Sequence, residues 1–296
     1  MTEIKVKDEG GDAMTMIDFG EFRSSLFGRT VEYIRDVNTH LKDFKFKDGD
    51  VLLCSYPKAG CTWTFEILTM LMKGKPEGPD QSKMHSMLEA TCASDIENIS
   101  SPRVLNTHLP YRRIPPDINN KKVKLVFVVR NPKDVAVSLY CMMYAFKHYN
   151  YTGKFSNWLP LFLRGDLAYD RYLKYLKDWE DVYRANKHDM LVLYFEELKR
   201  DTLGGVRKLA TFLDVSLTDE LIQEISEKCQ FLQMKQRYTP EMLGSSAYKE
   251  EINYGFMRKG EVGNWKEWLT VAQSETVDGM VSEDLKDSNL KFIYQL

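Results

Sequence analysis

The chain is poor in cysteine. Its 296 residues include five cysteines, an odd number, and no two of them form a CxxC pair. A disulfide framework and a structural zinc site both need more cysteines, or cysteines at closer spacing, than this chain has. The composition therefore predicts reduced thiols and no metal site, as is usual for a cytoplasmic protein.

Long apolar runs and an excess of one charge are also missing. No stretch approaches the ~18 apolar residues of a membrane helix, and the N-terminal MTEIKVKDEGGDAMTM lacks the apolar core of a signal peptide. Lysine and arginine number 41 against 43 acidic residues, which gives a net charge of -2. We therefore predict no membrane partner, no nucleic-acid partner and a cytoplasmic location, and any anion site has to be local.

What the sequence does contain is a regular alternation of two kinds of segment. Hydrophobic residues make up 43% of the chain, enough for a full core. Apolar runs typical of buried strands occupy residues 51–56, 103–108, 124–130 and 190–195. Patterns typical of helices occupy residues 62–74, 131–146 and 169–187. This alternation predicts an α/β fold with a central, mainly parallel sheet flanked by helices.

We predict one domain. No internal repeat, low-complexity tract or linker divides the chain. Residues 1–18 are polar and contain glycine, which predicts a flexible N-terminal tail. The domain itself is expected to span residues 19–296.

The first strand-to-helix turn has the chemistry of an anion site. In YPKAGCTWTFEI (56–67), a strand is followed by Lys58 and Gly60 and then by a helix. The glycine permits close approach of the backbone, the N–H groups at the helix start attract an anion, and the lysine adds a full positive charge. The nucleotide triphosphatase pattern GxxxxGK[ST] is absent, so the turn is only P-loop-like. Taken alone, this stretch is also compatible with an ordinary turn that carries a surface lysine.

Two further segments have anion-binding chemistry. In FVVRNPKDVAVS, Arg130 closes a strand and Ser138 lies in the following helix. In FMRKGEVGNWKEWLT (256–270), Arg258 and Lys259 lead into Gly260. An arginine fork suits phosphate oxygens, although most arginines at strand ends are simply solvated and a basic loop is more often plain surface. Three such segments in one slightly acidic chain favour a real site.

YPKAGCTW, RNPKDVAVS and RKGEVGNWK, in this order, resemble the signature segments of the animal cytosolic sulfotransferases. The resemblance runs from about Phe22 to the C-terminus and includes LNTHLP (105–110) and KEWLTVAQSE (266–275). Enzymes of this family use 3′-phosphoadenosine 5′-phosphosulfate (PAPS) as donor and release 3′-phosphoadenosine 5′-phosphate (PAP). The resemblance therefore implies transfer of a sulfuryl group from PAPS to a hydroxyl of a small-molecule acceptor, without a metal.

By this resemblance, His108 is the general base and Lys58 stabilises the leaving phosphate. A neutral imidazole can take the proton of an acceptor hydroxyl, and a fixed cation at the leaving oxygen acts mainly in the transition state. Asn106 and Ser138 complete the implied catalytic set, with Ser138 placed to hydrogen bond to Lys58. The implied donor-binding residues are Lys58, Ala59, Gly60, Cys61, Thr62, Trp63, Arg130, Ser138, Phe195, Cys229, Phe231, Met234, Arg258, Lys259 and Gly260.

The implied donor site has a phosphate end and a base end. Arg130, Ser138 and the 258–260 loop would hold the 3′-phosphate. Trp63 and Phe231 match the positions that stack on adenine, a contact worth about 1–3 kcal/mol per base. Without the resemblance, a tryptophan at a helix start would be assigned to core packing.

The chain departs from the family pattern at four positions. Asn106 stands where the family usually has a lysine, two residues before His108, so an amide replaces a charge. Phe195 stands for a tyrosine, and Cys61 and Cys229 stand for threonines, which exchanges hydroxyl partners for weaker ones. These changes predict lower donor affinity and rate rather than another reaction, and we expect Asn106→Lys to raise the rate.

The tetrapeptide NTHL occurs twice, at residues 38–41 and 106–109. His108 follows an apolar strand and precedes Pro110, which predicts a position at a sheet edge. His40 lies in a polar helical pattern, which predicts a surface histidine.

The acceptor pocket is expected to involve residues 82–96, the segment after Ser138, and residues 236–257. These regions carry apolar, adaptable side chains, namely Met84, Met87, Met142, Met143, Phe146 and Tyr149. They favour a small hydrophobic phenol, and Glu89 or Asp95 offers a carboxylate for an amine on it. Ordinary core packing is the competing interpretation of these side chains.

The C-terminal KEWLTVAQSE fits the family's dimer pattern Lys-x-x-x-Thr-Val-x-x-x-Glu. It predicts a homodimer through residues 266–275, that is, through Lys266 to Glu275. A solvated helix start is the alternative.

Two other functions also stay open. One is a sulfotransferase-like nucleotide-binding protein with weak or no turnover, suggested by Asn106 and Phe195, and the other is a P-loop kinase or nucleotide triphosphatase, disfavoured by the missing GK[ST].

Overall fold

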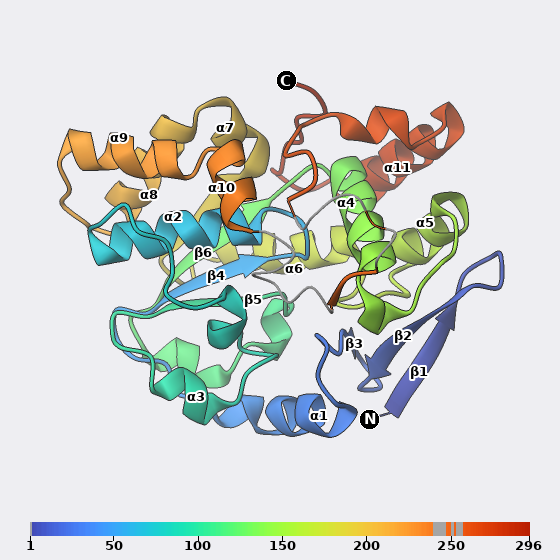
Figure 1. Ribbon diagram of the computed structural model, residues 1–296, viewed down its shortest axis with the longest axis horizontal. Coiled ribbons are helices and arrows are strands. Elements are labelled where there is room, and N and C mark those ends of the chain that lie inside the picture. The colour runs from blue at the N-terminus through green and yellow to red at the C-terminus, as the bar shows by residue number, and fades with distance from the viewer. Residues whose placement is uncertain (1, 239–246, 250–251, 253–256) are drawn as a thin grey trace. The chain divides into compact units, whose positions relative to one another are not determined.

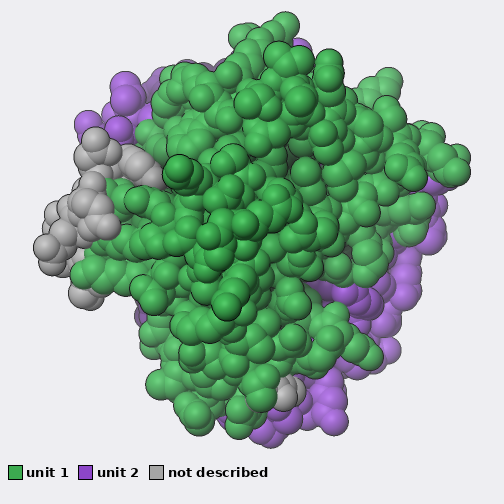
Figure 2. All heavy atoms as spheres, turned by 90° about the vertical axis from the view of Figure 1, so that its right-hand side faces the viewer, with its two compact units in different colours: residues 1–35, 130–181, 238–296 green, residues 36–129, 182–237 purple. Residues whose placement is uncertain are grey.

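The computed structural model describes residues 2–238, 247–249, 252 and 257–296 (Figure 1). The chain divides into two compact units, each assembled from segments that are distant in sequence (Figure 2). Unit 1 comprises residues 1–35, 130–181 and 238–296, and unit 2 comprises residues 36–129 and 182–237. Unit 1 contains a three-stranded antiparallel sheet, and unit 2 contains a four-stranded parallel sheet.

The strands are β1 (Thr2–Lys7), β2 (Ala13–Asp18), β3 (Arg23–Ser24), β4 (Val51–Ser55), β5 (Val104–Thr107), β6 (Lys124–Val129) and β7 (Met190–Tyr194). The first six α-helices are α1 (Val31–His40), α2 (Cys61–Lys73), α3 (Ala93–Glu97), α4 (Pro132–Ala145), α5 (Phe155–Arg164) and α6 (Tyr172–Arg184). The remaining ones are α7 (Phe195–Arg200), α8 (Thr202–Phe212), α9 (Asp219–Lys228), α10 (Phe231–Arg237) and α11 (Val271–Asp284). Two 3-10 turns matter below, η2 (Lys83–Ser86) and η7 (Asn264–Glu267).

The parallel sheet of unit 2 has the strand order β5-β4-β6-β7. Its register aligns Leu52 of β4 with Leu105 of β5 and with Leu125 of β6. Every residue of β4 is buried, which agrees with a strand covered on both faces and explains the continuous apolar run VLLCS. The predicted α/β fold, with a parallel sheet flanked by helices, is therefore confirmed.

Helix α2 packs against β4 and β5 and against α8 and α9, and Figure 1 shows it in front of the strands. The buried side chains of this cluster come from strands and helices alike: Leu53, Val126, Leu193, Ile67, Leu71, Val206, Leu209 and Ile225. Burial of an aliphatic side chain contributes about 1.5–3 kcal/mol, so this cluster fixes where α2 begins relative to the sheet. The start of α2 is the part of the helix that matters for function.

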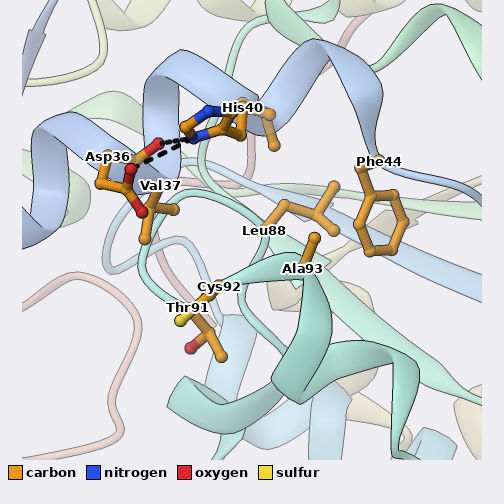
Figure 3. A pocket seen from close by; sticks show the side chains of 9 residues that line it. Asp36, Val37, His40, Phe44, Leu88, Thr91, Cys92 and Ala93 are labelled. Carbon is orange, nitrogen blue, oxygen red and sulfur yellow. Dashed lines mark hydrogen bonds and ion pairs between the residues drawn. The ribbon is translucent and has the colours of Figure 1, made fainter.

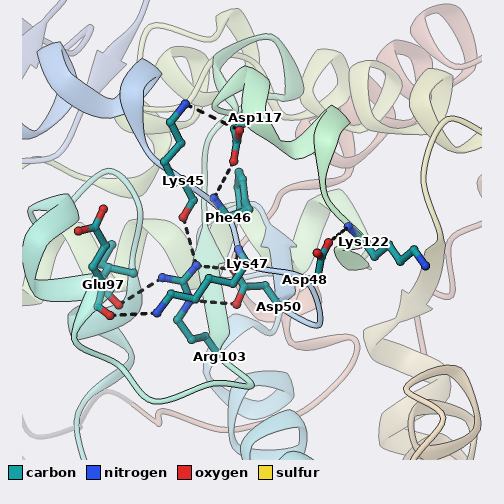
Figure 4. A network of polar contacts seen from close by, with 10 residues as sticks. Lys45, Phe46, Lys47, Asp48, Asp50, Glu97, Arg103, Asp117 and Lys122 are labelled. Carbon is teal, nitrogen blue, oxygen red and sulfur yellow. Dashed lines mark hydrogen bonds and ion pairs between the residues drawn. The ribbon is translucent and has the colours of Figure 1, made fainter.

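A buried ion pair holds the beginnings of β4 and β5 together (Figure 4). Arg103 precedes β5 and donates from Nε to Oδ1 of Asp50 over 2.9 Å and from Nη2 to Oδ2 over 2.5 Å. Both side chains are 0% exposed, and Arg103 also donates to the carbonyl of Lys45 over 3.2 Å. A two-pronged pair of this kind sets the register of two strands that no hairpin connects.

The predicted helix boundaries are close to the observed ones. Asn131 caps α4 by accepting a hydrogen bond from the backbone N–H of Asp134 over 2.8 Å, and Pro132 occupies the first turn. Gly74 ends α2 in the left-handed conformation, with a φ of 61°. The last strand is shorter than predicted, because Phe195 begins α7 instead of ending β7.

The N-terminal residues form a hairpin, so the expectation of a flexible tail over residues 1–18 is wrong. Strands β1 and β2 pair antiparallel along their whole length. Met14 and Met16 are fully buried, and Asp8 accepts from the hydroxyl of Tyr151 over 2.6 Å. The polar residues of β1 are exposed on a strand whose partner, β2, is buried. A short polar sequence does not by itself indicate that it pairs with such a strand.

Unit 1 also contains α4 packed against α5. Tyr140 of α4 lies in edge contact with Phe155 and Trp158 of α5, at centroid separations of 5.3 Å and 5.7 Å. Among the residues described, no helix combines the length and the apolar character needed to cross a membrane.

Candidate active site

The turn between β4 and α2 has the backbone of an anion site. After Ser55, the N–H of Ala59 closes a tight turn onto the carbonyl of Tyr56 over 3.1 Å. Lys58 has a φ of 69°, a left-handed conformation that costs a non-glycine residue about 1–2 kcal/mol. Gly60 follows with a φ of 126°, and α2 begins directly after it. We call residues 57–62 the anion turn.

Gly60 has no tolerable substitute. Its φ is outside the range of side-chain-bearing residues, and an added Cβ would lie 3.0 Å from Cδ2 of Phe195. No side chain caps α2 at Gly60, so the first N–H groups of a 13-residue helix point out of its N-terminus. These groups and the helix dipole favour an anion at this position.

His108 lies at the carboxyl end of β5, one residue after Thr107 ends that strand. The side chain is buried, and its Nδ1 is 2.5 Å from the carbonyl oxygen of Ser55, the last residue of β4. Because a carbonyl can only accept, Nδ1 carries the hydrogen, and Nε2 of the neutral ring carries the lone pair. The carboxyl ends of β4 and β5 thus orient the ring beside Ser55, two residues before the anion turn.

The surroundings of His108 keep it neutral. Burial lowers the pKa of His108 well below its usual value, the positive charges of Lys83 and Lys58 lower it further, and the hydrogen bond to Ser55 opposes this. The ring is therefore uncharged at neutral pH. A neutral imidazole with a defined tautomer has the properties of a general base.

Glu89 supports the same strand end. Its Oε1 accepts from the backbone N–H of His108 over 2.8 Å, and its Oε2 accepts from the hydroxyl of Thr107 over 2.8 Å. Burial raises the pKa of Glu89 to about 7, although these hydrogen bonds and the charge of Lys83 act in the opposite direction. One carboxylate oxygen therefore accepts from His108 and the other from Thr107, which differs from the acceptor-facing carboxylate expected at this position.

Asn106 is fully buried, and its side-chain amide is hydrogen-bonded to η2. Its Nδ2 donates to the carbonyl of Lys83 over 2.7 Å and to Oγ of Ser86 over 3.0 Å. Its Oδ1 lies 3.9 Å from the thiol of Cys61. Both amide hydrogens are therefore used to attach η2 to β5.

Trp63, Phe195 and Cys229 lie together on one side of α2. The indole N–H of Trp63 donates to the carbonyl of Cys229 over 2.7 Å, and its ring lies edge-on to Phe195 at 5.5 Å. Burial raises the pKa of the Cys229 thiol to about 12, so it stays protonated and apolar. These contacts confirm that the three sequence-predicted residues share one neighbourhood.

Phe231 and Met234 lie on α10, which is joined to α2 by one ion pair. Arg237 of α10 donates to Oε2 of Glu66 over 2.9 Å, and Glu66 is almost fully buried in α2. Met234 is completely buried, whereas Phe231 is half-buried with the ammonium of Lys199 at 5.7 Å from its ring. Phe231 therefore has exposed ring surface available for stacking, whereas Met234 has no exposed surface.

The second set of predicted residues belongs to unit 1. Arg130 exchanges backbone hydrogen bonds with the hydroxyl of Tyr172, at 3.2 Å and 2.7 Å, and its Nη2 donates to the carbonyl of Glu261 over 3.3 Å. Asp134 accepts from the backbone N–H of Gly263 over 2.8 Å. The start of α4 thus holds the 257–263 loop beside Arg130.

The basic residues of that loop are only partly neutralised. Arg258 donates to Oδ1 of Asn264 over 2.5 Å, and Lys259 pairs with Glu267 at 2.6 Å. Gly260 has a φ of 65°. Ser138 lies half-buried on α4, one turn beyond Asp134. In unit 1, Arg130 just before α4 and Arg258 and Lys259 of the 257–263 loop therefore belong to two segments that are hydrogen-bonded to each other.

The expected acceptor residues divide into two kinds. Met87, Met143 and Tyr149 are buried core residues, whereas Met84, Met142 and Phe146 are half-buried. Asp95 is exposed and accepts from the thiol of Cys92 over 3.4 Å. Most of the expected stretch 236–257 lies outside the described residues.

The two NTHL copies differ as predicted. His40 is 64% exposed and pairs with Asp36, with 3.2 Å between Nδ1 and Oδ1. Figure 3 shows it among the residues that line a pocket, together with Val37, Leu88 and Cys92. Among the described residues that line this pocket there is no lysine, no arginine and no strand residue, so the surroundings of His40 are unlike those of His108.

Two residues of this neighbourhood escaped the sequence motifs. Ser55 binds the ring of His108 through its backbone carbonyl, which no side-chain pattern signals. Lys83 affects the ionisation of Cys61, Glu89 and His108 from η2. Within the described ranges, no cluster of three or more His, Cys, Asp or Glu side chains is arranged to hold a metal ion.

Comparison with known proteins places the chain in a family. A family model described as "Sulfotransferase domain" matches residues 48–289. The protein named Amine sulfotransferase from Oryctolagus cuniculus is 32% identical over 285 residues, covering 93% of each chain. Sulfotransferase 1A1 of Rattus norvegicus is 30% identical and covers 90% of this chain and 94% of its own. The chain therefore belongs to the sulfotransferase family, as its motifs predicted.

Solved structures agree with this assignment. Mouse sulfotransferase SULT7A1 complexed with PAP is similar at a TM-score of 0.75 and 25% identity, over 93% of this chain and 96% of its own. Retinol dehydratase in complex with androsterone and PAP gives a TM-score of 0.74 at 20% identity, over 98% and 92%. The second likeness supports the fold alone.

Proposed function

We propose that this chain is a PAPS-dependent sulfotransferase that acts on a hydroxyl, preferably a phenolic one, of a small hydrophobic acceptor. His108 acts as general base, and Lys58 stabilises the leaving phosphate. The chain works in the cytoplasm as a homodimer. Membership of the sulfotransferase family and a neighbour solved with PAP support the donor.

One observation carries the proposal. His108 is buried and neutral, its Nδ1–H donates to the carbonyl of Ser55, and Ser55 ends the strand that leads into the anion turn. A base and an anion-binding backbone are thus fixed to adjacent strand ends. This is the pairing that transfer of an anionic group to a hydroxyl requires.

The anion turn fits a phosphosulfate. Gly60 exposes backbone without a Cβ, α2 directs its first N–H groups outward, and Lys58 adds a charge. These groups would hold the bridging and sulfuryl oxygens together with Ala59, Cys61 and Thr62. In the reaction, the acceptor oxygen bonds to sulfur while the bond from sulfur to the 5′-phosphate oxygen breaks. The hydroxyl proton passes to Nε2 of His108, and PAP leaves with the bonding electrons.

The remaining donor residues have roles that the local contacts support. Trp63 and Phe231 would stack on the adenine, beside Phe195, Cys229 and Met234. Arg130, Ser138 and the 258–260 loop would bind the 3′-phosphate, because Arg130 already contacts that loop through Glu261. A cation pair on a loop held by α4 suits a dianionic phosphate.

The test is transfer of labelled sulfate from PAPS to a panel of phenols, catecholamines, steroids, alcohols and amines. We expect transfer to at least one phenol. Amines belong in the panel because one relative carries the name Amine sulfotransferase. Tight PAP binding without transfer to any acceptor would contradict the proposal.

A second candidate has one observation in its favour. Asn106 brings no charge to its position, and its amide hydrogens are committed to η2. A chain that binds PAP but turns over weakly or not at all would be compatible with this. The transfer panel separates the two candidates, because only the enzyme consumes PAPS in the presence of acceptor.

A further inference from the structure

A second ammonium group reaches the head of α2. Lys83 is the first residue of η2, a segment outside all the anion-binding motifs. Its backbone carbonyl accepts from Nδ2 of Asn106 over 2.7 Å, and Oδ1 of the same amide lies 3.9 Å from the thiol of Cys61, the first residue of α2. The half-buried Lys83 side chain lowers the pKa of that thiol, against the effect of burial. Its charge also acts on Glu89 and on the ring of His108. One ammonium therefore lies within electrostatic range of the anion turn, the proposed base and the carboxylate behind the base.

Asn106 holds η2 at this position. Its two amide hydrogens bind the carbonyl of Lys83 at 2.7 Å and Oγ of Ser86 at 3.0 Å. Its own carbonyl accepts from the N–H of Leu88 over 3.1 Å, and it forms a parallel bridge with Met87. Because Asn106 is fully buried, these bonds are shielded from water and strong. The amide thus fixes the backbone from which the Lys83 side chain extends.

The positive charges around His108 and the start of α2 favour binding of an anion. The charges of Lys83 and Lys58 both lower the pKa of His108. The N-terminus of α2 adds a partial positive charge beside Cys61. Like charges brought together in partly buried surroundings repel each other, and a bound anion removes that repulsion. The carboxylate at hand, Glu89, is raised to a pKa of about 7 and is only partly ionised at neutral pH.

We propose that Lys83 is a catalytic residue whose ammonium binds the oxygens of the transferred sulfuryl group, and that Asn106 is the positioning residue that holds it there. This inference rests on the proposed function. The cation that position 106 lacks is supplied from η2. As sulfur passes from the phosphate oxygen to the acceptor oxygen, a fixed cation stabilises the charge on the sulfuryl oxygens. The structure therefore reverses the expectation for Asn106→Lys, which breaks the attachment of η2 and does not raise the rate of the otherwise unchanged chain.

The first experiment measures kcat and KM of Lys83 variants. Lys83→Met is expected to lower kcat about 10²- to 10³-fold, in the range found when one transition-state donor is removed. Lys83→Arg keeps the charge and is expected to retain most of the rate. Lys42→Met removes an exposed lysine of the same unit and is the matched control, with unchanged rate. Equal losses in Lys83→Met and Lys83→Arg, or a rate of Lys83→Met within about twofold of wild type, would overturn the proposal.

A rescue separates charge from structure. In the Lys83→Met background, Asn106→Lys returns an ammonium next to Cys61 and is expected to recover part of the lost kcat. In the wild-type background the same change is expected to leave kcat unchanged or lower. A rise in the wild type and no recovery in the double variant would show that the charge at position 106, rather than Lys83, limits the reaction.

Two readouts do not depend on turnover. In Lys83→Met, the imidazole resonance of His108 is expected to titrate at a higher pH, because burial, Lys58, Glu89 and the Ser55 carbonyl remain. Affinity for PAPS is expected to fall about tenfold while affinity for PAP changes little, because only PAPS carries the sulfuryl oxygens. If the wild type transfers no sulfate, the proposed function is wrong, and this result does not test the role of Lys83. If Lys83→Met changes neither the pH at which His108 titrates nor the affinity for PAPS, the assignment of Lys83 is wrong, whether or not the wild type transfers sulfate.

Discussion

At the scale of single residues, the surroundings of each histidine decide its chemistry. Both copies of NTHL present the same four letters, yet His108 is buried against Ser55 and His40 is 64% exposed beside Asp36. Burial removes the charged form of His108, and the Ser55 carbonyl selects its tautomer. A neutral, oriented ring and a solvated one therefore follow from identical local sequence.

This contrast gives a matched pair of variants. His108→Ala is expected to reduce transfer at least about 10²-fold, because the acceptor proton loses its base. PAP affinity is expected to stay within about twofold, because the anion turn is intact. His40→Ala is the control and should change neither quantity. Steady-state kinetics and calorimetric titration with PAP measure both, and near-normal transfer by the His108 variant would mean that another group is the base.

Glu89 predicts a dependence of stability on pH. Its pKa rises from the usual 4.5 to about 7 in the folded chain, with burial as the largest cause. Between these values the folded chain binds more protons than the unfolded chain, so the Glu89 contribution to the free energy of unfolding is present below pH 4.5 and is lost by about pH 7. Glu89→Gln is expected to abolish this loss and to be more stable than wild type above pH 7, by about 1–3 kcal/mol.

The opposite slope from His108 is present in both proteins and cancels in their difference. The pKa of His108 is lowered on folding, so its contribution is lost as the pH falls below its unfolded value. Urea unfolding of wild type and Glu89→Gln at several values between pH 4.5 and 8 measures that difference. A difference that stays constant across this range would mean that Glu89 is ionised throughout.

At the scale of elements, the sheet depends on an ion pair at its start. Arg103 and Asp50 are both 0% exposed and joined by two hydrogen bonds (Figure 4). Arg103→Met leaves the Asp50 carboxylate buried without its partner, which is expected to lower the free energy of unfolding by about 3–5 kcal/mol. The control is Lys47→Met, since Lys47 is exposed and only reaches the carbonyl of Glu97 at 3.1 Å. Denaturant midpoints compare the two, and equal small losses would show that the buried pair is replaceable.

The same scale shows which parts of the structure were predictable from sequence. Strong apolar or helical patterns mark β4, β6, α2 and α4. Helix boundaries also have their own signals, such as Asn131 at the start of α4 and Gly74 at the end of α2. The N-terminal hairpin has weak local patterns and depends on contacts such as that between Tyr151 and Asp8, which are 143 residues apart. Elements that carry their own signal were predicted, and elements defined by distant partners were not.

The candidate site divides in the same way. The anion turn is a continuous string, and Lys58, Gly60 and the start of α2 could be identified within it. Lys83 sits 23 residues before Asn106 in a segment with no anion-binding pattern, and only the hydrogen bond between them reveals the relation. The polar sequence around Lys83 does not indicate that this residue contacts the end of a distant strand.

At the scale of the whole molecule, the remaining question is assembly. In the segment from Lys266 to Glu275, Lys266 donates to Oε1 of Gln295 over 2.5 Å, and Thr270 forms a capping box with Gln273 at the start of α11. Val271 is left 75% exposed next to that cap. An apolar side chain held in a fixed position on a helix start suits a two-fold contact in which the same segment pairs with itself.

Val271→Glu is therefore expected to convert the proposed dimer into a monomer, because a buried carboxylate would face its own copy across the two-fold axis. Leu232→Glu is the control, since Leu232 is 70% exposed on α10 outside the segment. Light scattering coupled to size exclusion, over a range of concentrations, measures both. A contact built from so short a segment falls below the area of about 1,200–2,000 Å² of stable interfaces, so the wild-type dimer is expected to dissociate on dilution. A wild-type chain that is monomeric at high concentration would show that there is no dimer. A dimer that is lost in Leu232→Glu and kept in Val271→Glu would show that the contact lies outside residues 266–275.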